Sequence, residues 1–263
     1  MTIPTSPKHL LAVTTGILTT LSLQGGIISL YQGTGDLNNF TVSNSTDSDT
    51  LESGGMIRQF DNDSGGRTTM RYLPSSAFSD GLQVSFNVLD SSTDDMNVFR
   101  IGTDGASLAG GADATLGVRM TSIGNIVAET SSGNIIWGGA FTPGEQFNLS
   151  IIYNSTGSTL NVGSGISLNV NEWAITVDGA ILDNGTATST GLSYNNQTIA
   201  QDMWWLTGFA SSRTGSDIQY DNIVIATGSD IAVVPEPSAT VLGVGILSLA
   251  VLLVRRVRRR NRG

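Results

Sequence analysis

The stretch Leu82-Gln83-Val84-Ser85-Phe86-Asn87-Val88 alternates apolar and polar residues without exception. Successive side chains of a β-strand point to opposite faces of the sheet, so this period of two predicts a strand with one buried face. An amphipathic helix would instead repeat its apolar residues every three or four positions. No helical pattern of useful length occurs between residues 27 and 231. The stretch therefore indicates an all-β fold.

Shorter apolar runs on both sides extend this pattern. We predict less regular strands at residues 97–101, 116–120, 147–153, 160–162, 173–177, 204–209 and 218–225. Turn-forming dipeptides lie between the runs: Asp80-Gly81, Asp104-Gly105, Pro143-Gly144, Asp178-Gly179 and Asn184-Gly185. Many short strands separated by such turns are typical of an antiparallel sandwich or barrel. The absence of a fixed-period repeat argues against a propeller or a solenoid.

The composition limits the chemistry open to this region. The chain has 263 residues, no cysteine and one histidine, His9, near its N-terminus. A Ser-His-Asp triad, a Cys-His pair and a usual zinc site are therefore excluded from the β region. From Asp36 to Glu236, six arginines stand against twenty-two acids, which gives a net charge of −16, and lysine is missing. Such a surface repels nucleic acid, so we expect no nucleic-acid partner.

Two local patterns are candidate binding sites. Trp204 and Trp205 are adjacent, so in a strand their side chains point to opposite faces. One would then face the core, and the other would be open to stack on a sugar. The alternative is that both tryptophans are core residues. The segment 61–66, DNDSGG, resembles the opening of a calcium loop with Asp61 and Asp63 as oxygen ligands. It departs from the EF-hand pattern at the fifth and twelfth positions, and solvated turns are the alternative.

Three sequence segments together resemble those of the concanavalin A-like, laminin-G-like jelly roll. They are the strand over 144–154, the strand over 173–179 that runs into an Asp-Gly turn, and the closing strand 218–225. The resemblance covers about residues 28–227 and implies an antiparallel two-sheet sandwich. Glycoside hydrolases of that family often carry an E-x-D-x-x-E pattern, whereas Glu52, Glu129, Glu145 and Glu172 are widely separated. We therefore expect no catalytic residue and no enzyme activity.

Both ends of the chain carry predicted targeting segments. Residues 1–26 resemble a secretory signal peptide, with Lys8 ahead of the apolar stretch 10–23; a buried strand or an uncleaved anchor is the alternative. The β domain would then span residues 27–231. Residues 232–263 begin with Pro235-Glu236-Pro237 and continue into an uncharged apolar run, 239–254, that we predict to be a transmembrane helix. The chain closes with six arginines in the tail 255–263: Arg255, Arg256, Arg258, Arg259, Arg260 and Arg262.

This order of triplet, apolar span and arginine cluster resembles the PEP-CTERM sorting signal of Gram-negative bacteria. The resemblance implies recognition by the membrane protease-transferase exosortase, export, and association with exopolysaccharide or biofilm. The arginines independently orient the span, with the C-terminus in the cytoplasm and the β domain outside. A permanent single-span anchor is the alternative. We thus expect an exported, non-enzymatic surface or matrix protein, with a carbohydrate-binding lectin-like module as the alternative hypothesis and a glycoside hydrolase as a third.

Overall fold

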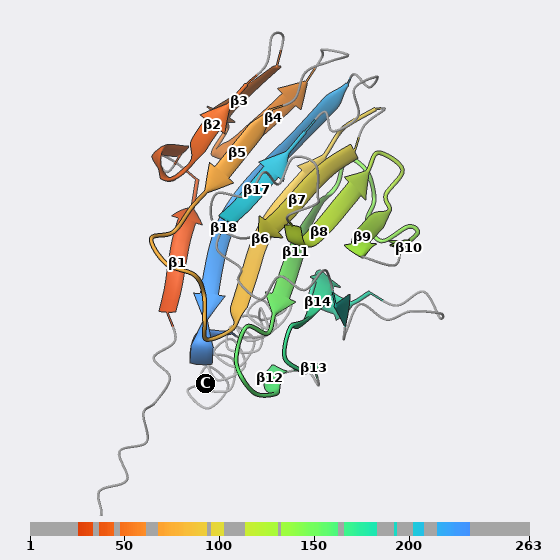
Figure 1. Cartoon of the computed structure of the whole chain (residues 1–263). Coiled ribbons are helices and arrows are strands. Elements are labelled where there is room, and N and C mark those ends of the chain that lie inside the picture. Colours follow the sequence, from red (N-terminus) through yellow and green to blue (C-terminus); the bar gives the residue numbers. More distant parts are fainter. Residues whose placement is uncertain are drawn as a thin grey trace, which may run out of the picture.

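A computed structural model describes residues 26–33, 37–44, 48–61, 68–93, 96–102, 114–130, 133–162, 166–182, 192–193, 202–207 and 215–231. These residues form two large antiparallel sheets, a two-stranded hairpin and two short 3-10 helices, Leu37–Asn39 and Gly228–Asp230. Figure 1 shows the strands of the two large sheets running in similar directions in superposed layers. The prediction of an all-β, antiparallel sandwich is confirmed.

The nine-stranded sheet has the order β15-β14-β11-β6-β18-β4-β3, with β1 on β18 and β16 on β14. Its strands are β1 (Gly26–Tyr31), β3 (Ser48–Ser53), β4 (Met56–Asp61), β6 (Leu82–Asp90), β11 (Gln146–Tyr153), β14 (Glu172–Val177), β15 (Ala180–Ile181), β16 (Leu192–Ser193) and β18 (Ser216–Thr227).

The seven-stranded sheet has the order β10-β9-β8-β7-β17-β5-β2. Its strands are β2 (Thr41–Ser43), β5 (Thr69–Tyr72), β7 (Met96–Gly102), β8 (Ala114–Thr121), β9 (Ile126–Thr130), β10 (Gly133–Trp137) and β17 (Asp202–Leu206). The hairpin consists of β12 (Leu160–Val162) and β13 (Ile166–Leu168).

Each strand predicted from the sequence corresponds to an observed strand. The predicted strand 204–209 is β17, which begins two residues earlier and ends at Leu206; residues 208–209 lie outside the described part. The predicted Asp178-Gly179 turn joins β14 tightly to β15, and its two residues have φ angles of 49° and 80°. Both residues of such a hairpin turn require positive φ, which is why this dipeptide favours it. The predicted turns at 104–105 and 184–185 lie outside the described residues.

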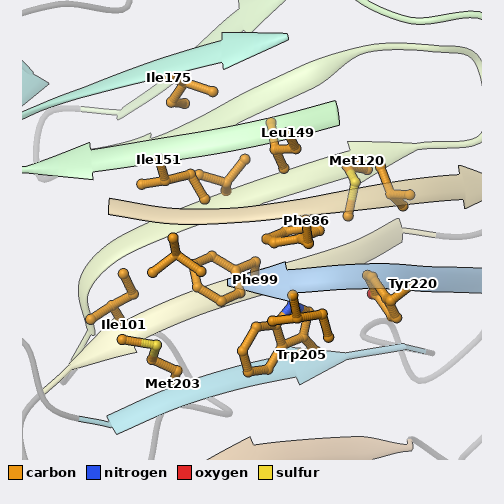
Figure 2. Close-up of a cluster of buried hydrophobic side chains, with 14 of the residues drawn as sticks. Phe86, Phe99, Ile101, Met120, Leu149, Ile151, Ile175, Met203, Trp205 and Tyr220 are labelled. Carbon is orange, nitrogen blue, oxygen red and sulfur yellow. The ribbon is translucent and has the colours of Figure 1, made fainter. Parts of the chain in front are cut away.

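The main core fills the space between the two sheets. Phe86 of β6 lies within 6.0 Å, between ring centroids, of Phe99, Trp205 and Tyr220. Figure 2 shows these four rings together, with aliphatic side chains such as Ile151 and Met203 around them. Aromatic pairs in tilted or edge-on contact contribute about 0.5–1.5 kcal/mol each beyond the apolar area they bury. Strand β6, which contains the alternating stretch 82–88, therefore supplies the centre of the core.

The outer face of β6 differs from the prediction of one buried face. Gln83 and Ser85 are buried even though they point away from the main core. Their side chains bond to Ser150 of β11, with N–O and O–O distances of 2.9 Å. Gln83 also pairs in register with Ile152, whose side chain packs in a second small core with the β12–β13 hairpin. A central strand is thus covered on both faces, and hydrogen bonds compensate the buried polar groups.

None of the helices among the described residues combines the length and apolar character needed to cross a membrane. The predicted signal peptide falls almost entirely on residues 1–25, which lie outside the described part, as do the sorting triplet, the predicted span 239–254 and the arginine tail.

Candidate functional site

Polar and charged side chains gather on the outer face of the seven-stranded sheet, the face turned away from the core. The antiparallel register places Arg71, Trp204, Arg100, Gly117 and Glu129 opposite one another on β5, β17, β7, β8 and β9. Directly opposed residues of neighbouring strands project to the same face, so these five positions form one row across the sheet. Arg119 of β8 lies on the same face, two residues along from Gly117.

At one end of the row, Arg71, Asp202 and Trp204 form what we call the Trp204 cluster. Nε and Nη2 of Arg71 donate to the two carboxylate oxygens of Asp202 at 2.8 and 2.6 Å. The Trp204 indole N–H donates to the same carboxylate at 2.8 Å. The Arg71 guanidinium carbon lies 5.4 Å from the Trp204 ring centroid, a cation–π contact. The carboxylate thus fixes both the guanidinium and the indole.

The Trp204 cluster is partly open to solvent. Trp204 is half-buried, and the Arg71 side chain keeps 28 % of its surface exposed while Asp202 has none. Two residues of the edge strand β2, Thr41 and Ser43, are exposed beside β5. An aromatic ring, a guanidinium and neighbouring hydroxyl groups therefore share one accessible corner of the sheet. This combination provides a stacking surface with hydrogen-bond donors and acceptors around it.

The neighbouring Trp205 points to the opposite face of β17. It is fully buried and contacts Phe40, Phe86 and Phe99 in the main core. Because none of its surface is accessible, Trp205 is out of reach of a surface ligand. The sugar-contact prediction therefore rests on Trp204, as the alternation of strand side chains allows.

In the middle of the row, Arg100, Arg119 and Glu129 form a buried ion-pair triad. Nε and Nη2 of Arg100 each donate to Glu129 at 2.9 Å, and Arg119 Nε lies 3.1 Å from Oε1 of the same carboxylate. Arg100 is only 2 % exposed. A Cβ atom added to Gly117 would collide with the Glu129 carboxylate, so this glycine provides the space in which the pair forms.

Only one of the two predicted calcium ligands lies in the described part of the chain. Asp61 ends β4 with its side chain buried, opposite Ser216 of β18, and Asp63 lies outside the described residues. In the described part of the chain, no three His, Asp or Glu side chains are grouped to hold a metal ion. Calcium at Asp61 and Asp63 stays a prediction.

Arg71, Asp202 and the triad were not among the sequence-predicted site residues. Arg71 and Asp202 are 131 positions apart, and only the pairing of β5 with β17 brings them together. One sequence signal was available. The stretch from Asp36 to Glu236 has no lysine and only six arginines, so each arginine in a strand is a candidate for a specific ion pair.

No protein-family model matches the sequence, and no curated protein matches it. Solved structures do resemble it. A sialidase has a TM-score of 0.55 at 12 % identity, and the match covers 74 % of this chain but 17 % of the sialidase chain. A carbohydrate esterase of the Shiga toxin-encoding bacteriophage phi24B has a TM-score of 0.51 at 15 % identity, over 78 % of this chain and 100 % of the esterase chain.

A third similar structure is lectin I-B4 of Griffonia simplicifolia, in its metal-free form, with a TM-score of 0.49 at 8 % identity over 77 % of this chain and 98 % of the lectin. At these identities, the first two likenesses show a shared β-sandwich fold and nothing about activity.

Proposed function

We propose that this protein is a carbohydrate-binding module of the concanavalin A-like jelly-roll type, and that it binds polysaccharide at the Trp204 cluster. The observation that carries the proposal is the fixed orientation of Trp204. Its indole N–H bonds to Asp202 and its ring lies against Arg71, and the exposed residues Thr41 and Ser43 of the edge strand β2 lie on the same face. The fold shared with a sialidase and a carbohydrate esterase, whose names refer to carbohydrates, supports the same ligand class.

A held aromatic ring is well suited to sugars. Its apolar face packs against the C–H face of a pyranose ring, and hydroxyl and guanidinium groups around it satisfy the sugar hydroxyls. A ring that is already fixed loses little conformational entropy on binding, so more of the contact energy appears as affinity.

A glycan array with the intact protein tests this proposal. We expect Trp204→Ala to abolish binding, because it removes the stacking surface. Phe60→Ala is the matched control: Phe60 lies on the nine-stranded sheet beside Arg58, whose guanidinium carbon is 5.3 Å from the Phe60 ring centroid. Loss of binding in the Phe60 variant, with Trp204→Ala still binding, would contradict the proposal.

We propose binding without catalysis. Among the described side chains of this face, the carboxylates are Asp202 and Glu129, and each accepts two hydrogen bonds from an arginine. Their strands, β17 and β9, are separated by β7 and β8, so three steps of ~4.8 Å place their backbones about 14 Å apart. Glycosidase carboxyl pairs lie about 5–9.5 Å apart. Release of reducing ends from a bound polysaccharide would refute this part.

Export and sorting are a second proposal, supported by the sequence features of residues 1–26 and 232–263. Exosortase would recognise Pro235-Glu236-Pro237 outside the membrane while the arginine tail stays in the cytoplasm. Mass spectrometry of protein recovered from outside the cells tests it. We expect chains that end near residues 235–237; extracellular chains that retain Arg255 to Arg262 would rule out processing there.

A further inference from the structure

We infer that one end of the sandwich is a membrane-docking surface, which lies against the lipid head groups while the chain is anchored. The inference rests on the proposed export and sorting signal, and it adds the part of the domain that meets the bilayer. The chain enters and leaves the domain at this end, and exposed apolar side chains lie on both sides of that point.

This end is formed by the nine-stranded sheet. Its register places five residues of neighbouring strands in one row: Trp173, Tyr153, Leu82, Thr227 and Gly26, on β14, β11, β6, β18 and β1. The turns beyond the row bond to one another. Gly228 N–H donates to the Asp80 carbonyl at 3.0 Å, and Asn171 N–H donates to the Asn154 carbonyl at 2.9 Å. We call this end the base, and it comprises residues 26–28, 80–81, 154–158, 170–172 and 227–231. Figure 1 shows the start of β1, the end of β18 and the β12–β13 hairpin at this end.

The segments predicted to enter the membrane join the domain at the base. Gly26, where the predicted signal peptide ends, pairs with Thr227, whose hydroxyl donates to the Gly26 carbonyl at 3.4 Å. Ile231 is the last residue of the base, and the predicted span starts at residue 239, so the linker 232–238 has seven residues. A fully extended linker of this length reaches about 25 Å. An anchored chain therefore holds the base, rather than another part of the domain, next to the bilayer.

Exposed apolar side chains lie on both sides of this exit. In the described part of the chain, six large apolar side chains are exposed, and three of them belong to the base: Ile27 at 68 %, Ile28 at 37 % and Val170 at 45 %. Ile27 and Ile28 point to opposite faces of β1, so neither face is covered at the start of this strand. Val170 directly precedes β14, which lies four strands, about 19 Å, from β1. Apolar groups this far apart, on either side of the exit, fit a flat apolar partner such as a bilayer.

The charges of the base favour a lipid surface without net charge. The charged side chains of the base are Asp80, Glu172 and Asp230, and all three are acids. Anionic lipid head groups repel such a surface, whereas zwitterionic head groups do not. The base thus differs from a polybasic segment, which binds anionic lipid.

The anchor makes a small apolar surface sufficient. Membrane binding scales with the apolar area that is buried, and three side chains offer little. A short linker, however, gives the base an effective concentration on the order of mM at the bilayer. The contact therefore forms in the anchored chain and is released once the linker is cut near residues 235–237.

Quenching by a nitroxide on the lipid head group tests the inference with the full chain in phosphatidylcholine vesicles. The chain has no cysteine, so Val170→Cys and Ile123→Cys each provide a single site for a fluorophore. Ile123 is the matched control, because it is 73 % exposed but follows β8 at the other end of the sandwich. There Thr121 pairs with Met96, beside the last residue of β6. The nine residues of β6 separate the two ends by about 27 Å. We expect the label at residue 170 to be quenched and the label at residue 123 to be unaffected.

A second variant tests whether apolar contact holds the base against the lipid. Ile27→Asp with Ile28→Asp, in the Val170→Cys chain, should lower the quenching to the level at residue 123. Both side chains are exposed, so these changes leave the core intact. Ile136→Asp, at an exposed isoleucine of β10 in the other sheet, should leave the quenching unchanged. Adding phosphatidylglycerol to the vesicles should weaken the quenching, and NaCl should restore it.

Flotation of the chain with the vesicles reports the anchor separately. Equal quenching at residues 170 and 123 in chains that float would overturn the inference and leave the anchor standing. Quenching at residue 170 that persists in the Ile27→Asp, Ile28→Asp chain would also overturn it. A chain that does not float with the vesicles would overturn both the anchor and the docking surface.

Discussion

At the scale of single residues, Gly117 decides whether the buried triad can form. A methyl group at this position would occupy the space of the Glu129 carboxylate, which bonds to Arg100. Gly117→Ala should therefore displace a buried charge from its partner, which typically costs about 3–5 kcal/mol of folding free energy. Urea denaturation measures this loss.

Gly157→Ala is the matched control for that experiment, since nothing lies within 4 Å of a Cβ atom added at Gly157. We expect it to change the free energy of unfolding by less than about 0.5 kcal/mol. If Gly117→Ala were equally mild, the triad would not depend on this close approach, and the account of how the sequence positions Glu129 would be wrong.

Asp90 predicts a pH dependence of stability. Burial raises its pKa above the usual value, although the Ser92 backbone N–H and the Asn97 amide donate to its carboxylate at 2.9 and 3.2 Å. An acid whose pKa is raised on folding favours the folded state below the unfolded pKa of about 4, and this contribution is lost as pH rises through the folded pKa. We therefore expect the Tm of wild type, relative to that of Asp90→Asn, to fall as pH rises from about 4 to 7. A Tm difference independent of pH would contradict the assignment.

At the scale of elements, one buried side chain, that of Asn154, adds hydrogen bonds to the apolar cluster that holds the β12–β13 hairpin. The Asn154 amide nitrogen donates to the backbone carbonyls of Ser158 and Leu168 at 2.8 and 2.9 Å, and its oxygen accepts from Thr156. Asn154 itself is fully buried. Asn154→Ala removes the donor to the buried Leu168 carbonyl and the acceptor of the Thr156 N–H, whereas the exposed Ser158 carbonyl keeps the Thr156 hydroxyl as a donor. We therefore expect a loss of about 1–3 kcal/mol in the free energy of unfolding.

Hydrogen exchange locates that loss. The amides of β12 and β13 should exchange faster in Asn154→Ala, whereas Asn161→Ala, at an exposed position on β12, should leave exchange unchanged. Unchanged exchange in the Asn154 variant would show that the apolar cluster of Ile152, Ile166 and Leu168 holds the hairpin alone.

The elements also show how far the sequence could predict this molecule. The period of two in β6 and the positive-φ dipeptide at Asp178-Gly179 are local signals, and they predicted a strand and a tight turn correctly, although the period of two did not predict that both faces of β6 are buried. Strands β2 and β5 have only three and four residues, too few for a periodic pattern, and were not predicted. The site depends on their pairing: without the register of β5 against β17, nothing indicates that Arg71 lies beside Trp204. Adjacency in the strand did indicate that Trp204 and Trp205 face opposite sides.

At the scale of the whole molecule, the two outer faces of the sandwich differ in chemistry. The nine-stranded sheet carries the hairpin and the Gln83–Ser85–Ser150 network on its outer face. The seven-stranded sheet carries three of the four described arginines, Arg71, Arg100 and Arg119, and the half-buried Trp204, whereas Arg58 lies on the nine-stranded sheet. Both sheets contribute side chains to the core between them, so packing of the core does not account for this difference. It is the basis for placing the ligand on the seven-stranded sheet.

The position of bound polysaccharide on the two sheets can be measured. Amide hydrogen exchange of the intact protein, with and without the polysaccharide that it binds on the array, reports which strands the ligand covers. We predict new protection in β2, β5 and β17, around Trp204, and none in β6, β11 and β18. Protection confined to the nine-stranded sheet, with β5 and β17 unchanged, would contradict the account.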